Sequence, residues 1–251
     1  MKLSKYSANG NDFVIFDSKE KKDRAELAQV LCHRQDGVGA DGLIVLVPHE
    51  SLDFEWEFYN ADGSHADMCG NGSRAAAHYA YNNDLAPLNM SFLTGAGVIN
   101  AKVSDNTNTN AMVLSELTPP KILDKEIVFN GHSWWLLNTG VPHLVCIKES
   151  VDNFDIEEAR ALRNKYNANV NICAVSGDNL KVRTYERGVE DETLACGTGM
   201  AACFYRALQE NKVKESIEVY PTSGETLYLG VNDRTITFKG RVVNTFNTVW
   251  E

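Results

Sequence analysis

Residues 68–74 read Met-Cys-Gly-Asn-Gly-Ser-Arg, and residues 195–199 read Ala-Cys-Gly-Thr-Gly. The shared Cys-Gly-x-Gly motif begins at Cys69 and at Cys196, 127 positions apart, and small residues follow each copy. Tyr59 and Tyr185 end expected strands before the two motifs and lie 126 positions apart. Because a constant offset indicates an internal repeat, we predict two homologous halves of about 120 residues, each with one motif at the start of a helix.

The hydrophobic pattern predicts strands and helices in the same order in both halves. The segment 54–59 alternates apolar and charged residues, which predicts a half-exposed strand. Residues 186–195 are expected to form a loop, and Thr118-Pro119-Pro120 is the expected boundary between the halves. We expect helices over 23–31, 69–81, 155–166 and 196–209, and strands over 13–16, 43–47, 54–59, 144–147, 170–175 and 180–185.

Composition excludes several classes of protein. The 251 residues carry a formal net charge of −10, which disfavours nucleic-acid binding. The longest aliphatic run, 43–47, is far shorter than the roughly 20 residues of a membrane helix. Since the N-terminus also lacks the apolar core of a signal peptide, we expect a cytoplasmic protein without a membrane partner.

The six cysteines show neither disulfide nor metal-site spacing. No pair has C-x-x-C spacing and no histidine pair has H-x-x-x-H spacing, so we expect no metal. In a cytoplasmic protein an even number of cysteines does not imply disulfides. The four cysteines outside the repeated motif are expected to be core thiols: Cys32, Cys146, Cys173 and Cys203.

A cysteine at a helix N-terminus is suited to proton transfer. The helix dipole and the unpaired N–H groups of the first turn favour the thiolate, and the same N–H groups can bind a carboxylate. If the halves face each other, one thiolate removes a proton from a carbon and the other thiol returns one on the opposite face. The result is racemisation or epimerisation without pyridoxal phosphate, with the transition state stabilised by fixed dipoles.

Longer stretches of the chain resemble the diaminopimelate epimerase family over nearly its whole length. The resemblance implies an isomerase without cofactor that converts LL-2,6-diaminopimelate to meso-diaminopimelate by two-base thiolate/thiol proton transfer. Such an enzyme serves lysine and peptidoglycan biosynthesis. The stretches that carry the resemblance are residues 10–14, 37–42, 58–64, 68–74, 140–143, 169–171, 182–188 and 192–199.

The same resemblance implies an α/β (α+β) fold of two pseudo-symmetric halves. Each half is expected to be a curved β-sheet or barrel wrapped around a central α-helix, with the active site in the cleft between the halves. Residues 1–117 would form the N-terminal half, joined by a C-terminal strand at about 241–251. Residues 118–240 would form the C-terminal half.

The resemblance also assigns site residues. Cys69 and Cys196 correspond to the two catalytic acid/bases. Glu186 and the carbonyl of Arg187 correspond to the group that binds the reacting ammonium. His143, together with Glu186, would tune the protonation of a cysteine. The backbone N–H groups expected to hold the reacting carboxylate belong to Gly70, Asn71, Gly197 and Thr198. The other substrate-binding positions, mostly at the distal end, are Asn11, Asn60, Asn171 and the guanidinium of Arg187.

One departure from the family pattern keeps other functions open. Val141 stands where the family usually has Asn in Gly-Asn-Pro-His, and Val cannot hydrogen-bond the distal end of a substrate. Asn138 is a candidate substitute. The alternatives are another amino-acid racemase on this fold, such as a histidine racemase, or a non-catalytic anion-binding module. We expect a small-molecule substrate and no cofactor, and we allow for a homodimer.

Overall fold

The chain divides into two compact units in the computed structural model, which describes residues 1–232 and 235–251. The N-terminal unit consists of Met1–Glu116 and Lys239–Glu251. The C-terminal unit consists of Leu117–Phe238. Strand β16 (Thr235–Val249) begins in the C-terminal unit and ends in the N-terminal unit, so the N-terminal unit is built from two separate parts of the chain.

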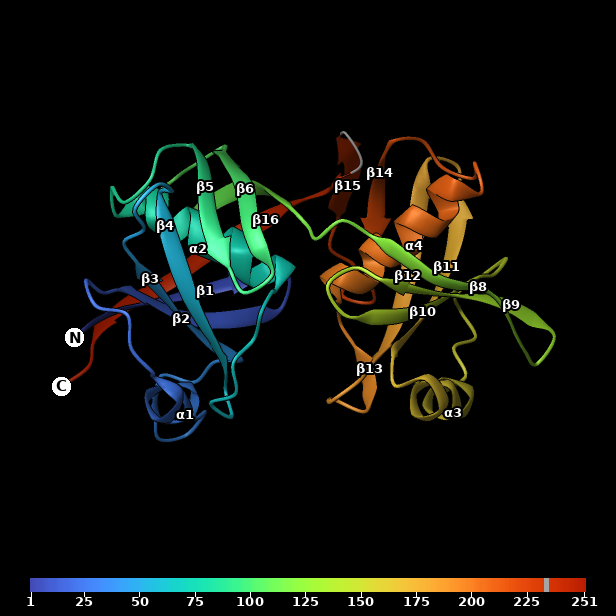
Figure 1. Cartoon of the computed structure of the whole chain (residues 1–251), viewed down its shortest axis with the longest axis horizontal. Coiled ribbons are helices and arrows are strands. Elements are labelled where there is room, and N and C mark those ends of the chain that lie inside the picture. The colour runs from blue at the N-terminus through green and yellow to red at the C-terminus, as the bar shows by residue number, and fades with distance from the viewer. Residues whose placement is uncertain (233–234) are drawn as a thin grey trace. The chain divides into compact units, whose positions relative to one another are not determined.

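A closed barrel of eight strands forms the N-terminal unit (Figure 1). Strands β1 to β7 follow one another around the barrel, and β16 lies between β7 and β1. The antiparallel pairing of β1 with both β2 and β16 closes the ring. The strands are β1 (Lys2–Ala8), β2 (Asn11–Asp17), β3 (Gly42–Val47), β4 (Phe54–Asn60), β5 (Asn89–Thr94), β6 (Gly97–Ser104) and β7 (Asn110–Glu116).

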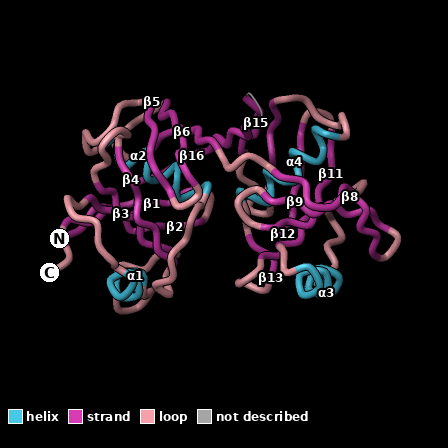
Figure 2. Tube along the Cα trace, viewed as in Figure 1, coloured by secondary structure: helices cyan, strands magenta, loops and turns pink. Residues whose placement is uncertain are grey.

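Helix α2 (Gly70–Asn82) runs through this barrel, as Figures 1 and 2 show. Its residues from Gly70 to Ala80 are all buried, so the helix has no solvent-facing side over most of its length. Small side chains allow such a helix to pack closely against strands on every side, which is why this segment is rich in alanine, glycine and serine. Helix α1 (Ala25–Cys32) connects β2 to β3 and packs against β3.

The C-terminal unit has a curved sheet and its own central helix, α4 (Gly197–Gln209). Helix α3 (Ile156–Tyr166) begins after Asp155, whose side chain accepts hydrogen bonds from two N–H groups of the first turn. The strands are β8 (Lys121–Phe129), β9 (His132–Asn138), β10 (Pro142–Ile147), β11 (Asn169–Ser176), β12 (Asn179–Glu186), β13 (Asp191–Thr193), β14 (Ser216–Tyr220) and β15 (Leu227–Asn232).

The two units share one pattern of strand pairing. In the N-terminal unit β2 pairs parallel with β3, β3 antiparallel with β4, β4 parallel with β5, and β5 antiparallel with β6. Strands β10, β11, β12, β14 and β15 repeat these four pairings in the same order. The central helix follows β4 in one unit, and it follows β12 and the short strand β13 in the other. The predicted fold class, α+β with two pseudo-symmetric halves, is confirmed.

Two local expectations were wrong. Residues 191–193, expected in a loop, form the short strand β13, which pairs with β12. The alternating segment 54–59 is a strand, but Glu57 is only 7% exposed instead of facing solvent. An ion pair with buried Arg24 compensates the Glu57 carboxylate. Alternation alone does not reveal such a partner, because Arg24 lies on a distant part of the chain.

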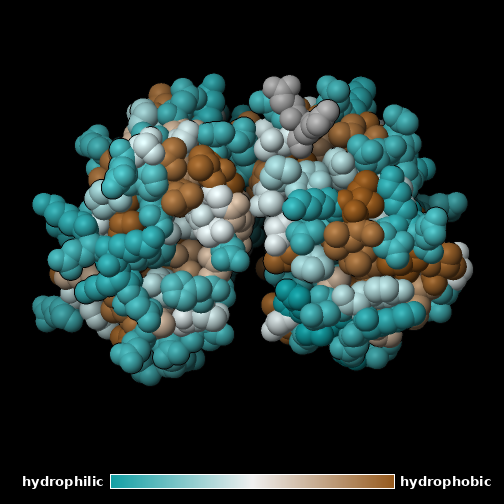
Figure 3. All heavy atoms as spheres, viewed as in Figure 1, coloured by the Kyte–Doolittle hydropathy of each residue, from teal (hydrophilic) through white to brown (hydrophobic). Residues whose placement is uncertain are grey.

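Strand β8 forms the edge of the sheet in the C-terminal unit. Figure 3 shows hydrophobic residues gathering over the β8–β9 hairpin, where Leu123 is 53% and Val128 is 71% exposed. Charged residues such as Lys125 interrupt this apolar surface, and the register with β9 shifts twice along β8. Charges and irregular register are common protections of an edge strand against pairing with another chain.

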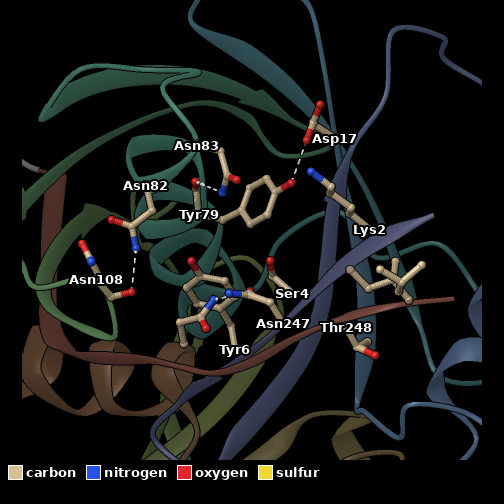
Figure 4. Close-up of a pocket in the computed structure, with 13 residues that line it drawn as sticks. Lys2, Ser4, Tyr6, Asp17, Tyr79, Asn82, Asn83, Asn108, Asn247 and Thr248 are labelled. Atoms are coloured by element: carbon tan, nitrogen blue, oxygen red, sulfur yellow. Dashed lines mark hydrogen bonds between the residues drawn. The ribbon is translucent and has the colours of Figure 1, made fainter.

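A polar pocket of about 730 Å³ lies in the N-terminal unit near the C-terminal end of α2 (Figure 4). Burial raises the pKa of the Tyr79 hydroxyl in this pocket, and the hydrogen bond of 2.7 Å that it donates to Asp17 raises the pKa further. Cys69 lies at the other end of the same helix, so this pocket is separate from the predicted site. None of the helices among the described residues combines the length and apolar character that crossing a bilayer demands.

Candidate active site

Cys69 occupies the N-cap position of α2, with an extended backbone at φ −146° and ψ 118°. Its sulfur accepts a hydrogen bond from the backbone N–H of Gly72 at 3.4 Å. The first N–H groups of an α-helix have no partner within the helix, so those of Gly70 and Asn71 are available beside the thiol. Cys69 therefore lies at the N-terminus of a helix, as its sequence motif predicts.

Asn11 is the second group at the Cys69 sulfur. Its Oδ1 lies 3.6 Å from Sγ, and its Nδ2 donates a bond of 2.6 Å to Asp41. Because the carboxylate of Asp41 can only accept, Asn11 must direct its carbonyl oxygen towards Cys69. The side chain of Asn11 is thus oriented by Asp41, and Asp41 is in turn paired with Arg34.

Neighbouring charges hold this arrangement together. Arg34 makes two hydrogen bonds of 2.7 and 2.9 Å to Asp12, and Lys5 lies 2.8 Å from the same carboxylate. Burial alone would raise the pKa of Asp12, but the bonds from Arg34 and Lys5 lower it to about 2. Asp12 therefore stays ionised in the neutral range and acts, with Asp41, as a fixed acceptor.

Of the other predicted site residues in the N-terminal unit, Asn71 is buried and Asn60 is exposed. Asn71 is 5% exposed, and its Oδ1 accepts a bond of 2.6 Å from the fully buried guanidinium of Arg74. Arg74 also donates to Asn9 and to the carbonyl of Gly70. Asn60 ends β4 at an exposed position, where its Nδ2 donates to Ser64 at 2.9 Å. No sequence signal singled out Arg74, which braces the first turn of α2.

Cys196 occupies the N-cap position of α4, as Cys69 does for α2, and is 7% exposed. The Thr198 hydroxyl lies 3.6 Å from the Cys196 sulfur and 2.9 Å from Nε2 of His143. Thr139 fixes Thr198 further by donating to its carbonyl at 2.8 Å. His143 is therefore connected to Cys196 through the side chain of Thr198.

The hydrogen bonds determine which nitrogen of His143 carries the proton. Asn171 Nδ2 donates to the carbonyl of Leu144 at 2.9 Å and lies 3.1 Å from His143 Nδ1, while Thr184 donates to Asn171 Oδ1. An amide nitrogen only donates, so Nδ1 accepts and the proton is on Nε2. Asn169 Nδ2 lies 3.5 Å from Nε2, too far to compete with Thr198.

His143 is uncharged in this environment. The side chain is completely buried, and burial lowers its pKa to about 3. The positive charge of Arg187 also lowers this pKa. A neutral imidazole with its proton on Nε2 can donate to Thr198 throughout the neutral pH range.

Asn169, which the sequence interpretation did not select, lies beside Arg187. Its Oδ1 accepts a bond of 2.7 Å from the backbone N–H of Arg187. Asn171 is completely buried, and its amide is occupied by Leu144, His143 and Thr184. Glu186 ends β12 and Arg187 follows it; both are half-buried, and the Arg187 guanidinium donates to the carbonyl of Asn167 at 3.0 Å.

Val141 lies in the turn before β10, where its carbonyl accepts a bond of 3.3 Å from Thr139. Asn138, the candidate substitute for the missing amide, directs its Oδ1 to the N–H of Gly140 at 2.9 Å. This bond closes the turn, so the oxygen of Asn138 already accepts a hydrogen bond from the backbone. Within residues 1–232 and 235–251, no three histidine, cysteine, aspartate or glutamate side chains come together as a metal site would require.

The last glycine of the second motif is explained by packing against Asn171. A Cβ atom on Gly199 would lie 2.3 Å from Asn171 Oδ1 and 3.2 Å from Thr184 Oγ1. Gly199→Ala should therefore displace the amide that orients His143 and lower the free energy of unfolding by about 1–3 kcal/mol. Gly72→Ala is the matched control, because its Cβ would meet the Ile44 methyl group at 3.2 Å. Urea unfolding of both variants measures the difference, and an equal loss in both would contradict this explanation.

Burial of neutral His143 should make the protein sensitive to acid. The unfolded chain binds a proton near the ordinary pKa of 6.5, but the folded chain does so only near 3. The unfolded state then binds more protons, so stability falls as the pH decreases from 6.5 towards 3, by roughly 1.4 kcal/mol per pH unit. His143→Gln should reduce the slope between pH 6 and 4.5 by about one proton. Urea unfolding across this range, with exposed His132→Gln as control, tests the assignment; an unchanged slope would refute it.

Comparison with known proteins agrees with the repeated motif and the two-unit fold. The sequence profile of the diaminopimelate epimerase family matches residues 3–123 and 135–243. The diaminopimelate epimerase of a Nitratiruptor species is 60% identical over 100% of this chain and 99% of its own length. Those of Campylobacter lari and Helicobacter pylori are 53% and 40% identical over 96% of this chain, covering 96% and 93% of their own lengths.

Solved structures with little sequence identity share the fold. A probable proline racemase from Agrobacterium radiobacter K84 has a TM-score of 0.77 at 13% identity, over 100% of this chain and 92% of the other. A hydroxyproline epimerase from Agrobacterium vitis has a TM-score of 0.74 at 16% identity, over 99% and 91%. Because the family profile and the relatives both match across nearly all of its length, the chain belongs to the diaminopimelate epimerase family.

Proposed function

We propose that this protein is an epimerase without cofactor that converts LL-2,6-diaminopimelate to meso-diaminopimelate, with Cys69 and Cys196 as its two acid/base groups. The observation that carries the proposal is that each unit begins its central helix at a cysteine. The names of the full-length relatives support the substrate, and they favour this epimerase over the histidine racemase alternative.

In the proposed mechanism, a thiolate removes the α-proton from one face of the substrate carbon. The other cysteine, as a thiol, donates its proton to the opposite face, so that configuration inverts and the two sulfurs exchange protonation states. The N–H groups of the first helical turns stabilise the negative charge that develops on the carboxylate. They belong to Gly70, Asn71, Gly197 and Thr198.

The remaining proposed roles concern the two ends of the substrate. Glu186 and the carbonyl of Arg187 bind the reacting ammonium. Asn11 binds the part of the substrate that lies beside Cys69. Asn60 and the Arg187 guanidinium bind the distal end. We assign Asn169 to the distal end in place of Asn171, because Asn169 contacts Arg187 whereas the amide of Asn171 is occupied by its own unit.

The deciding experiment incubates the purified protein with LL-diaminopimelate in deuterated water without added cofactor. We expect meso-diaminopimelate with one deuterium at the inverted carbon, measured by chiral separation and mass spectrometry. The absence of both inversion and exchange would contradict the proposal, and binding without exchange would favour the anion-binding module. Turnover of histidine but not of diaminopimelate would instead establish the racemase alternative.

The biological setting is part of the same proposal. We propose that the protein acts in the cytoplasm in lysine and peptidoglycan biosynthesis, on a free small molecule and without nucleic-acid or membrane partners. The net charge of −10 supports the exclusion of nucleic acid, since binding to phosphates requires a basic surface. Sedimentation measures whether the protein forms the homodimer that we allow for.

A further inference from the structure

We propose that Glu190 is a positioning residue for substrate binding, and that its carboxylate sets the direction of the backbone carbonyl of Arg187. This role rests on the proposed function, in which that carbonyl and Glu186 bind the reacting ammonium. Glu190 itself does not bind the ammonium. It acts through the peptide group between Arg187 and Gly188.

The turn of residues 186–190 joins β12 to β13 and carries both ammonium-binding groups. Glu186 is the last residue of β12, and its carbonyl accepts a hydrogen bond of 2.8 Å from the N–H of Glu190. The N–H of Arg187 donates to Asn169 Oδ1 at 2.7 Å. The peptide group between Glu186 and Arg187 is therefore held at both of its polar atoms.

The next peptide group, between Arg187 and Gly188, is held by the side chain of Glu190. The N–H of Gly188 donates to Oε1 of Glu190 at 3.0 Å. This peptide is trans, and the N–H and C=O of a trans peptide point in opposite directions. The carbonyl of Arg187 must therefore point away from the carboxylate of Glu190, so the position of Glu190 determines the direction of the proposed ammonium-binding group.

Arg163 of α3 fixes the carboxylate of Glu190 in turn. Its guanidinium donates to the same Oε1 atom at 2.5 Å, and the side chains of Arg163 and Glu190 are 22% and 43% exposed. The hydrogen bond from Gly188 and the contact with Arg163 lower the pKa of Glu190, so this side chain is ionised at neutral pH. The charge of Arg163 also offsets the second negative charge that Glu190 adds near Glu186.

The backbone of the turn explains why this restraint is needed. Gly188 has φ +95°, and glycine adopts positive and negative φ about equally, so the peptide group before it can rotate at little cost. Such a rotation would turn the carbonyl of Arg187 away from the substrate. Glu190 has φ +61°, which is uncommon for a residue other than glycine. The turn thus keeps a glutamate where a glycine would be less strained, as expected if the carboxylate is required.

Glu190→Ala removes the carboxylate and should raise KM for LL-diaminopimelate about tenfold, with kcat within about twofold of the unaltered protein. This split is expected because the ammonium is bound in both the ground state and the transition state. Glu190→Gln keeps an acceptor oxygen at the end of a side chain of the same length and should restore most of the affinity. A merely structural role would lower the melting temperature without separating KM from kcat.

Gly188→Ala tests the same peptide group independently of Glu190. Among the described residues, no atom beyond the adjacent residues lies within 4 Å of a Cβ built on Gly188, so the substitution acts through the positive φ. It should favour the rotated peptide and raise KM. Gly177→Ala is the matched control, since Gly177 has φ +60° and similarly open surroundings between β11 and β12. An equal change of KM in both glycine variants would overturn the proposal.

Crystal structures of the Glu190 variants separate this role from the proposed function. The carbonyl of Arg187 should change direction in Glu190→Ala and keep its direction in Glu190→Gln. An unchanged carbonyl in Glu190→Ala would refute the role of Glu190, whatever the activity. If the alanine variant does not fold, Glu190→Gly removes the same carboxylate at a φ that glycine adopts freely. A reoriented carbonyl with an unchanged KM would contradict only the proposed contact between this carbonyl and the ammonium.

Discussion

Replacing Cys69 or Cys196 with alanine should lower kcat for epimerisation by about 10³-fold, because each variant lacks one of the two groups that must act on opposite faces of the carbon. The loss should not extend to every proton transfer. Each variant keeps one thiol and should exchange the α-proton of a single stereoisomer with solvent, with retention of configuration. Proton NMR in deuterated water follows this exchange, and chiral separation follows inversion.

The control for this prediction lies on the same helix as Cys196. Cys203 is completely buried in α4, and the mechanism gives it no task. Cys203→Ala should therefore keep epimerase activity while losing some stability through the small cavity it leaves. Full epimerase activity in both Cys69→Ala and Cys196→Ala would show that the two-base mechanism is wrong.

Replacing Glu57 with glutamine should destabilise the N-terminal unit by about 3–5 kcal/mol, because it leaves the guanidinium of Arg24 buried without a counter-ion. Arg24 is 3% exposed and donates to Glu57, to Ser18 and to the carbonyls of Glu20 and Lys22. For a protein of this size the loss corresponds to a fall in Tm of about 6–20 °C. Thermal unfolding followed by circular dichroism measures it.

An exposed ion pair of the same chain provides the comparison. Glu157 and Arg160 form a pair at 2.6 Å in which the side chains are 81% and 47% exposed. Glu157→Gln should change stability by less than about 1 kcal/mol, since solvent screens an exposed pair. If the two glutamine variants unfold at the same temperature, the buried pair with Arg24 does not stabilise the fold.

The architecture could be predicted because its signals are local and repeated. A cysteine followed by glycines marks the start of each central helix, and small side chains mark the buried helix itself, so one copy of the pattern supports the other. The burial of Glu57 could not be predicted in this way. Its charge is compensated by Arg24, and the contact between them depends on the path of the chain between β2 and α1.

The difficulty of choosing between Asn169 and Asn171 from the sequence has a geometric cause. Residues two apart in a strand point to the same face, so both amides extend from the same side of β11. What distinguishes them is their position along the strand. Asn169, at its first residue, contacts the turn that contains Arg187, whereas Asn171 lies deeper, beneath the first turn of α4, where Gly199 leaves room for it.

Strand β16 imposes an order on the folding of the two units while the protein is being synthesised. It closes the barrel of the N-terminal unit between β7 and β1, yet residues 239–249 leave the ribosome more than a hundred residues after β7. Until then the nascent N-terminal unit is an open sheet with two unpaired edges, at β1 and at β7. The C-terminal unit is continuous in sequence and can complete its sheet first. The half that starts first on the ribosome therefore finishes folding last, and its edges need protection from aggregation during that delay.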